Sequence, residues 1–300
     1  MQVFITGGTG YIGEAVIREL LAAGHEVTGL CRSDAAMQRL AAMGARAVRG
    51  ELHDPSSFTG IAAEHDGIVH LAFDYSREGV TADRASLEAL LYAAADSDRP
   101  RALIYTSGVW VLGHTAGVVD ESGSTARPLE MVAWRTAHER LALEENGPRL
   151  ATSVIRPGIV YGGHGGLVGP FFATAANESA ARVVGDGKNR WSLVHRADLA
   201  RLYRLVLEQA AAGIFHGVDG VPLPVAEIAR LASEAAGRGG KIVHVPPDEA
   251  RRTMGPMVDA LLLDQAVIGR RAVDLGWRPE HPSFTDGVGA AYREWREEAR

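Results

Sequence analysis

Three glycines near the amino terminus of this 300-residue chain are spaced at intervals of three, at Gly7, Gly10 and Gly13. They stand between an apolar, β-type run at residues 3–5 and a helical pattern of apolar residues that begins at Val16. Glycines let a backbone turn approach an anion closely, and the N–H groups at the start of a helix face negative charge. Because strand, turn and helix are all present, the motif predicts a site for the pyrophosphate of a dinucleotide. A purely structural glycine turn is the alternative.

The end of the second expected strand carries Cys31, Arg32 and Ser33. Enzymes that choose NAD usually have an acidic residue there, about 20 residues beyond the glycine turn, which binds the ribose hydroxyls. Cys31 takes that position here. The guanidinium of Arg32 suits the additional phosphate of NADP, and Ser33 can add a hydrogen bond. We therefore expect NADP, as NADPH, and expect NAD to be less favoured; a solvated surface arginine is the alternative for Arg32.

These residues need elements that bring strand ends and helix starts to one edge of a sheet. Short β-type runs alternate with helical patterns through the first half of the chain. Strands are expected over 2–6, 26–30, 45–49, 67–72, 101–107 and 151–155, and helices over 13–23, 35–43, 82–95 and 129–145. This alternation is typical of a parallel sheet with helices on both faces. It predicts an α/β fold with a doubly wound, Rossmann-type parallel sheet.

The last third of the chain is more mixed, and we expect it to form a smaller substrate-binding lobe interleaved with the first domain. The NAD(P)-binding Rossmann domain is placed at 1–160 and the lobe at 161–300, within one compact unit. A glycine-rich stretch at 162–166 breaks the pattern and is expected to begin a loop that reaches residue 176. A strand followed by a helix is expected over 194–207, a short strand over 214–217, a helix over 225–236 and a strand over 241–245.

Composition excludes several classes of protein. A formal net charge of −6 gives no sign of a surface for nucleic acid or an acidic membrane. The single cysteine, Cys31, excludes an internal disulfide and a cysteine metal cage, and the histidines lack ligand spacing, so we expect no metal. No apolar run approaches a membrane span, and the chain opens directly on its first strand. The expected compartment is the cytoplasm.

Five further segments carry a resemblance to a known family. They are Glu51-Leu52, His-Leu-Ala at 70–72, Arg-Pro-Gly-Ile-Val-Tyr-Gly at 156–162, Val-His-Arg-Ala-Asp-Leu-Ala at 194–200 and Leu-Gly-Trp-Arg-Pro at 275–279. With the glycine turn they resemble, in type and order, the short-chain dehydrogenase/reductase superfamily. The branch is the extended or atypical one, which includes the NAD-dependent epimerase/dehydratase-like proteins. The likeness runs nearly from end to end, and six weak motifs in the right order are specific together.

The resemblance implies which residues contact the cofactor. The acid-Leu step at 51–52 touches adenine in the family, the segment after the fourth strand lies beside the adenosine, and the 157–160 backbone meets the nicotinamide. The expected cofactor-binding residues are Gly7, Thr9, Gly10, Tyr11, Ile12, Gly13, Arg32, Ser33, Glu51, Leu52, Leu71, Ala72, Phe73, Thr106, Arg135, Pro157, Gly158, Ile159 and Val160.

The catalytic residues of the family are replaced in this chain. Family enzymes use a Ser or Thr with a Tyr-x-x-x-Lys pair, in which the tyrosine exchanges the hydroxyl proton and the lysine lowers its pKa. Aligning Glu-Arg-Leu at 139–141 with the family places Met131 at the tyrosine position and Arg135 at the lysine position. Gly108 falls at the serine position, directly after Ser107. Arg135 cannot act as a general base, but it can donate hydrogen bonds to the nicotinamide ribose; helix packing is the alternative.

The group that replaces the tyrosine is left open. The candidate catalytic residues are Arg135, Ser107 and Tyr161, and packing explains Tyr161 equally well. Further protic side chains on segments that border the pocket in related folds are Asp74, Tyr75, His114 and His138. We expect His138 to lie on an outward part of its helix and His195 to be a buried motif histidine.

The resemblance implies an oxidoreductase that uses NADP on a small, apolar carbonyl, enone or imine metabolite, without the usual Tyr-x-x-x-Lys pair. Two other interpretations stay open: a non-catalytic NADP-binding sensor or partner-binding protein, and a non-redox lyase, epimerase or cyclase. Trp110, Trp134 and Trp191 favour an apolar ligand, or belong to the core. The expected partner is a small-molecule substrate, with no nucleic acid and no membrane. Many relatives pair as homodimers, although this chain shows no distinct apolar seam.

Overall fold

The computed structural model describes residues 1–299. They form two units that alternate along the sequence. The first unit contains 1–107, 134–156 and 199–215, and the second contains 108–133, 157–198 and the chain from 216 onward. Each unit has a hydrophobic core of its own. The placement of a domain boundary after residue 160 stays a prediction.

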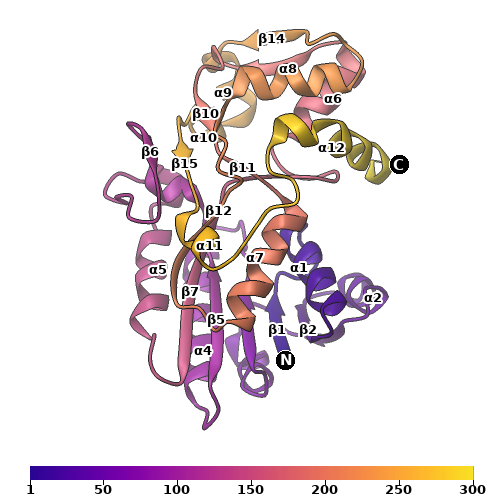
Figure 1. Cartoon of the computed structure of the whole chain (residues 1–300). Helices are drawn as coiled ribbons and strands as arrows, with labels where there is room; N and C mark the ends of the chain where they lie inside the picture. Colours follow the sequence, from indigo (N-terminus) through magenta and orange to yellow (C-terminus); the bar gives the residue numbers. More distant parts are fainter. Residues whose placement is uncertain (300) are drawn as a thin grey trace. The chain divides into compact units, whose positions relative to one another are not determined.

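A seven-stranded sheet forms the centre of the first unit (Figure 1). Its spatial order is β12 (Gly213–Gly217), β7 (Leu150–Pro157), β5 (Arg101–Thr106), β4 (Gly67–His70), β1 (Gln2–Thr6), β2 (Glu26–Cys31) and β3 (Arg46–Arg49). The pairs from β3 through β7 are all parallel. An order of 3-2-1-4-5 is that of a doubly wound sheet, in which ligands bind beyond the carboxyl ends of the strands where the order reverses. The predicted α/β fold class is confirmed.

Helices lie on both faces of this sheet. Figure 1 shows α4 (Gly79–Ala95) and α5 (Arg135–Glu144) on one side, with α1 (Tyr11–Ala22) and α7 (Arg196–Glu208) on the other. The unit also contains α2 (Asp34–Ala42), α3 (Thr59–Ala62) and the 3-10 turn η1 (Pro55–Ser57). In α1, the apolar residues at helical spacing, Val16, Ile17 and Leu20, are fully buried against the sheet.

The predicted helix over 129–145 is wrong in its first part. The structure has a separate 3-10 turn, η3 (Glu130–Val132), and α5 begins only at Arg135. Neither Leu129, which precedes η3, nor Trp134, which precedes α5, supplies a side-chain cap, so the local sequence does not mark where the α-helix begins. The chain also passes from the second unit to the first between residues 133 and 134, which separates the two pieces.

The second unit is built from short strand pairs and helices. β8 (Ile159–Tyr161) pairs with β11 (Leu193–His195), β9 (Ala181–Val184) with β14 (Ile242–Val245), β6 (Val118–Val119) with β15 (Ala266–Val267) and β10 (Arg190–Trp191) with β13 (Leu223–Pro224). Its helices are η2 (Val109–Leu112), α6 (Gly169–Glu178), α8 (Val225–Ala235), α9 (Pro247–Met254), α10 (Met257–Leu261), α11 (Arg270–Asp274) and α12 (Phe284–Glu298).

The prediction of a loop through residue 176 is wrong, because α6 occupies most of it. Pro170 stands in the first turn of α6, where its missing N–H costs nothing. Phe171, Phe172 and Ala175 share the buried face of the helix. The apolar pattern of α6 is short and directly follows a glycine-rich stretch, which is typical of a loop.

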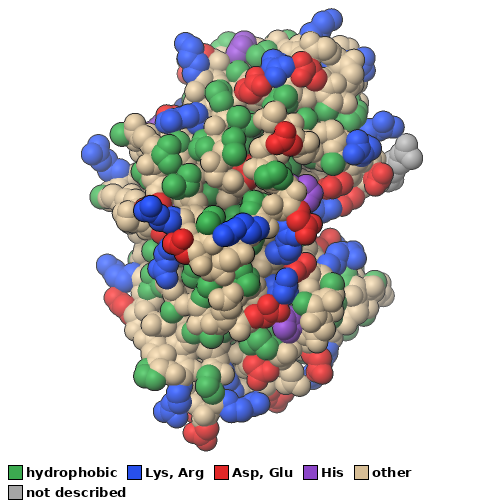
Figure 2. Space-filling view, viewed as in Figure 1, with side chains coloured by type: hydrophobic (Ala, Val, Ile, Leu, Met, Phe, Trp, Pro, Cys, Tyr) green, Lys and Arg blue, Asp and Glu red, His purple; other side chains and the backbone are tan. Residues whose placement is uncertain are grey.

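The surface charges and the lengths of the helices agree with the amino-acid composition. On the face shown in Figure 2, Lys and Arg side chains are interspersed with Asp and Glu, in keeping with the small net charge. Within residues 1–299, no helix combines the length and apolar character that a membrane crossing requires.

Candidate functional site

A cavity of about 810 Å³ lies within the first unit, where β1, β2, β3, β4 and β5 end. Its volume falls in the range of small-molecule and cofactor sites, roughly 300–1,000 Å³. The expected cofactor-binding residues line it, except for the segment Pro157–Val160. Ser107 also lines it, as do Asp74 and Tyr75. The cavity therefore brings together the segments that follow five different strands of the sheet.

The glycine turn forms one wall of the cavity with no room for side chains. Gly7 has a φ of +75°, and a Cβ on it would lie 2.6 Å from the backbone nitrogen of Ala72. A Cβ on Gly13 would lie 2.1 Å from the carbonyl oxygen of Gly7. Gly10 precedes α1 and gives it no side-chain cap. The turn leads directly into the amino terminus of α1, whose dipole favours negative charge, so it fits a diphosphate.

Two arginines, Arg32 and Arg39, line the cavity near the end of β2. The Arg32 guanidinium has no hydrogen-bond or ion-pair partner within residues 1–299. Ser33 caps α2, because its hydroxyl accepts a hydrogen bond from the Ala36 N–H at 3.2 Å. Arg39 also lines the cavity: it pairs with Glu14 and donates to the Thr9 carbonyl at 3.1 Å.

Arg39 was missed by the sequence analysis. In the sequence, only its position six residues after Ser33, on the helix that follows the expected phosphate site, indicated that Arg39 could reach the cavity. Cys31, at the position where NAD enzymes hold an acid, is buried, and its thiol donates to the Val48 carbonyl at 3.4 Å. Burial raises the pKa of that thiol, so Cys31 contributes no negative charge to the cavity at neutral pH.

Arg135 forms part of the same cavity in a fixed position. Its Nη1 donates to the Thr106 carbonyl at 3.0 Å and to the Tyr105 hydroxyl at 3.3 Å. Its guanidinium carbon lies 4.4 Å from the ring centre of Trp134 and 5.2 Å from that of Phe73. Hydrogen bonds and aromatic faces together leave the guanidinium little freedom to move.

A buried polar network supports Arg135 from behind. The Tyr105 hydroxyl donates to Asp83 Oδ2 at 2.8 Å, and His138 Nδ1 lies 2.7 Å from the same oxygen. His70 Nε2 lies 3.5 Å from the other oxygen of Asp83, and its Nδ1 is 2.7 Å from the Thr6 hydroxyl. The network thus connects the end of β1 with Arg135 through four buried side chains.

Asp83 is the charged centre of this network. Burial alone raises the pKa of Asp83, but the hydrogen bond from His138, the close approach of His70 and the charge of Arg135 outweigh it. The pKa of Asp83 therefore lies well below its usual range, and the carboxylate is ionised inside the protein. Burial raises the pKa of Tyr105 well above its ordinary value, so the phenol remains a hydrogen-bond donor.

The prediction that His138 lies on an outward part of its helix is wrong. Its side chain is buried against Asp83 of α4. His138 and Ala142 are four residues apart, and both lie on the buried face of α5. Ser107 Oγ is buried at the cavity and has no hydrogen-bond partner within residues 1–299.

The remaining expected residues belong to the second unit. Gly158 packs directly against the backbone of Ser192, because a Cβ there would lie 2.3 Å from the Ser192 carbonyl oxygen. Tyr161 is buried, with edge-to-face ring contacts to His195 and Phe284 at 5.2 and 5.1 Å. Met131 is exposed on η3. The roles of Pro157–Val160 at the nicotinamide and of Tyr161 in catalysis stay predictions.

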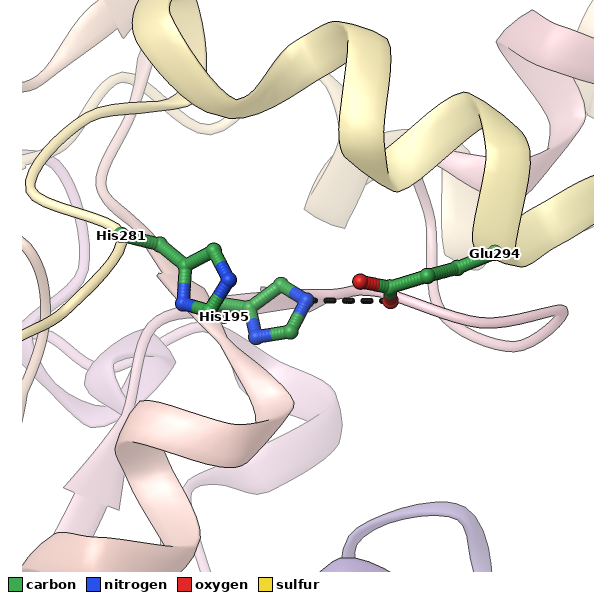
Figure 3. A group of neighbouring side chains, drawn as sticks. All are labelled: His195, His281 and Glu294. Atoms are coloured by element: carbon green, nitrogen blue, oxygen red, sulfur yellow. Dashed lines mark hydrogen bonds and ion pairs between the residues drawn. The ribbon is translucent and has the colours of Figure 1, made fainter.

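A group of potential metal ligands lies in the second unit: His195, His281 and Glu294, whose ligand atoms are within 4.8 Å of one another (Figure 3). The two imidazole rings stack at 3.7 Å with an angle of 24° between their planes. A metal lies in the plane of each imidazole that binds it, and two stacked rings cannot both meet this condition. Each ring instead has its own carboxylate: His195 faces Glu294 at 3.2 Å, and His281 faces Asp198 at 3.0 Å.

Comparisons with known proteins agree with this geometry. The profile of the NAD dependent epimerase/dehydratase family matches residues 3–216. An uncharacterized protein of Saccharomyces cerevisiae is 31% identical over 303 residues, which cover 97% of this chain and 99% of the yeast protein. A 4-hydroxy-2-methyl-3-oxo-4-farnesyl-3,4-dihydroquinoline-1-oxide ketoreductase of Stigmatella aurantiaca is 30% identical over 260 residues, covering 84% of this chain and 78% of the enzyme.

A solved structure also resembles the fold over its whole length. The human epimerase family protein SDR39U1, crystallised with NADPH, superposes with a TM-score of 0.78 at 25% identity, covering 99% of each chain. The six motifs, which include the glycine turn, and the strand order lead to the same result as these similarities. The chain belongs to the NAD dependent epimerase/dehydratase family, the extended branch of the short-chain dehydrogenases/reductases.

Proposed function

We propose that the protein is an NADPH-dependent reductase of the atypical short-chain type, which acts on a small, apolar carbonyl, enone or imine. The observation that carries the proposal is the combination, in one cavity, of the glycine turn with Arg32 and with a fixed cation, Arg135. The turn fits a diphosphate, and Arg135 fits the negative charge that forms on a carbonyl oxygen during its reduction.

The preference for NADPH rests on charge at the end of β2. The Arg32 guanidinium, which has no partner within residues 1–299, offers charge-assisted hydrogen bonds to a phosphate dianion, and the Ser33 hydroxyl lies next to it in the chain. The amino terminus of α2, which starts at Asp34, adds favourable dipole charge. A buried neutral thiol replaces the acid that would repel that phosphate. The NADPH complex of the human relative supports the same choice.

Reduction requires a hydride at carbon and a proton at oxygen, and NADPH supplies the hydride when it is bound. Arg135 stays protonated at ordinary pH, so it stabilises negative charge without giving up a proton. The Ser107 hydroxyl, which has no partner within the described chain, can donate a hydrogen bond to the substrate oxygen, and a water molecule in the cavity would supply the proton. We assign electrostatic stabilisation to Arg135 and this hydrogen bond to Ser107.

An apolar substrate suits the aromatic side chains of the cavity. Phe73 and Trp134 stack with ring centres 5.0 Å apart, and Tyr75 meets Phe73 edge-on at 5.1 Å. Phe73 and Tyr75 both line the cavity. The Stigmatella ketoreductase is named for a farnesyl-bearing ketone, which supports an apolar ketone as the substrate class for this chain.

Cofactor choice is tested by calorimetry with NADPH and NADH on wild type, Arg32→Ala and Arg18→Ala. Arg18 is an exposed arginine of α1 outside the cavity, and it serves as the matched control. We expect Arg32→Ala to weaken NADPH binding at least tenfold and to leave NADH binding unchanged. Equal binding of the two cofactors by wild type would refute the NADPH assignment.

Activity is tested by oxidation of NADPH with a panel of apolar ketones, enones and imines. We expect turnover with at least one class, and we expect Ser107→Ala to lower kcat while leaving the affinity for NADPH unchanged. Tight NADPH binding with no oxidation across the panel would overturn the reductase proposal and favour a non-catalytic NADP-binding sensor.

A further inference from the structure

A second cavity, of about 340 Å³, lies entirely within the second unit. Phe171 of α6 and Trp191 of β10 form an aromatic wall, with ring centres 5.9 Å apart and 28° between the ring planes. Aliphatic side chains from α8, β14 and α10 complete the lining, with Val225, Val245 and Leu261 as examples. Both aromatic rings are almost fully buried. The cavity is therefore a preformed hollow beside the core of this unit.

Two hydroxyl side chains of the lining already have partners in the protein, whereas the Trp191 indole N–H is buried with no partner within residues 1–299. The Thr174 hydroxyl donates to the Pro170 carbonyl at 2.8 Å and accepts from the Arg182 N–H at 3.1 Å. The Thr253 hydroxyl donates to the Ala250 carbonyl at 3.1 Å.

The two charged side chains of the lining are compensated in the same way. Arg182 pairs with Glu178 at 3.3 Å and with Glu249 at 3.9 Å. Apart from the Trp191 N–H, which suits a single ligand oxygen, these groups give a polar ligand little to bind, whereas a hydrocarbon would remove aromatic and aliphatic surface from water.

We propose that this cavity is a binding site for an uncharged, hydrocarbon-rich molecule, an alkyl chain or ring system of on the order of ten non-hydrogen atoms. That size follows from the 340 Å³ volume, at about 30 Å³ for each water-sized group. Hydrophobic and aromatic walls with a small number of polar groups are typical of small-molecule sites. Binding here requires neither a cofactor nor turnover, so the inference stands independently of the proposed reductase activity.

The test uses 1-octanol as the probe and octane-1,8-diol as its polar counterpart, each titrated into the full-length protein by calorimetry without cofactor. Two variants reduce the cavity. Ala250→Leu fills it from the buried wall, and Thr253→Trp covers it from an exposed position of α9. Arg252→Trp, on the exposed side of the same helix and outside the cavity lining, is the matched control. Circular dichroism establishes that each variant is folded.

We expect 1-octanol to bind at one site per chain, and octane-1,8-diol to bind at least tenfold more weakly. We expect Thr253→Trp, and Ala250→Leu if it folds, to weaken octanol binding at least tenfold, while Arg252→Trp binds as wild type does. The proposal is overturned if wild type does not bind octanol, or if Thr253→Trp binds it unchanged. NADPH affinity, measured on the same variants, stays unchanged in either case, so this outcome is independent of the test of cofactor binding.

Discussion

Replacing Asp83 by asparagine removes the one negative charge of the buried network behind Arg135. Asp83 is 1% exposed and accepts from the Tyr105 hydroxyl at 2.8 Å, with His138 Nδ1 at 2.7 Å and His70 Nε2 at 3.5 Å. An asparagine retains one oxygen but presents an amide N–H₂ to a neighbour that had faced a carboxylate. Leaving a buried hydrogen-bonding group without its partner costs about 1–3 kcal/mol for each group, because the group stays desolvated.

The assay is urea unfolding of wild type and Asp83→Asn at pH 7, with Asp34→Asn as the matched control. Asp34 is 82% exposed on its side chain and pairs with Arg49 at the surface, so its loss is expected to cost no more than about 1 kcal/mol. We expect the free energy of unfolding of Asp83→Asn to fall by several times that amount. A loss equal to that of the surface control would refute the conclusion that Asp83 is an ionised centre of the network.

Three further perturbations test other parts of the account. Gly13→Ala places a Cβ against the Gly7 carbonyl, and calorimetry should show NADPH binding weakened more than tenfold; unchanged affinity would contradict the close turn. Tyr105→Phe removes one of two hydrogen bonds that hold Arg135 and should lower kcat severalfold in the NADPH oxidation assay, whereas an unchanged kcat would show that the phenol does not position Arg135. In thermal or urea unfolding, Asp219→Asn should stabilise the protein by a few kcal/mol at pH 8 and leave its stability unchanged at pH 4. An equal change in stability at both pH values would contradict a raised pKa of Asp219 as the cause.

The sign for Asp219 follows from its environment. Burial raises the pKa of Asp219 to about 7, above the value of about 3.9 expected in the unfolded chain. Between these values the folded state binds more protons than the unfolded state, so stability falls as pH rises. An asparagine resembles the protonated carboxyl and does not ionise, so the variant avoids the loss of stability that wild type suffers as the pH rises from about 4 to about 7.

The sheet could be predicted from the sequence because its strands are buried on both faces. Strands of this kind appear as continuous apolar runs, and β1 has the predicted bounds, Gln2–Thr6. The glycine turn and Arg32 are equally local signals, since the sequence itself places them directly after strands. The helices α6 and α12 were not predicted, because the patterns of the last third follow short strands and glycine-rich loops.

Residues whose roles depend on distant partners could not be predicted. Arg39 contacts a turn 30 residues away, and His138 meets a carboxylate 55 residues away on another helix. Glu139 belongs to the Glu-Arg-Leu segment at 139–141, and its carboxylate forms a buried, two-point ion pair with Arg156 at 2.9 and 2.5 Å. That pair fastens α5 to β7 and explains an Arg-Pro motif whose arginine had no assigned function.

The central claim is that the cavity of the first unit binds a phosphorylated pyridine dinucleotide. Calorimetric titration of the purified protein with NADPH, and separately with NADH, tests it most directly. The account predicts one site per chain, with NADPH bound at least tenfold more tightly than NADH. Failure to bind either cofactor at millimolar concentration would contradict it.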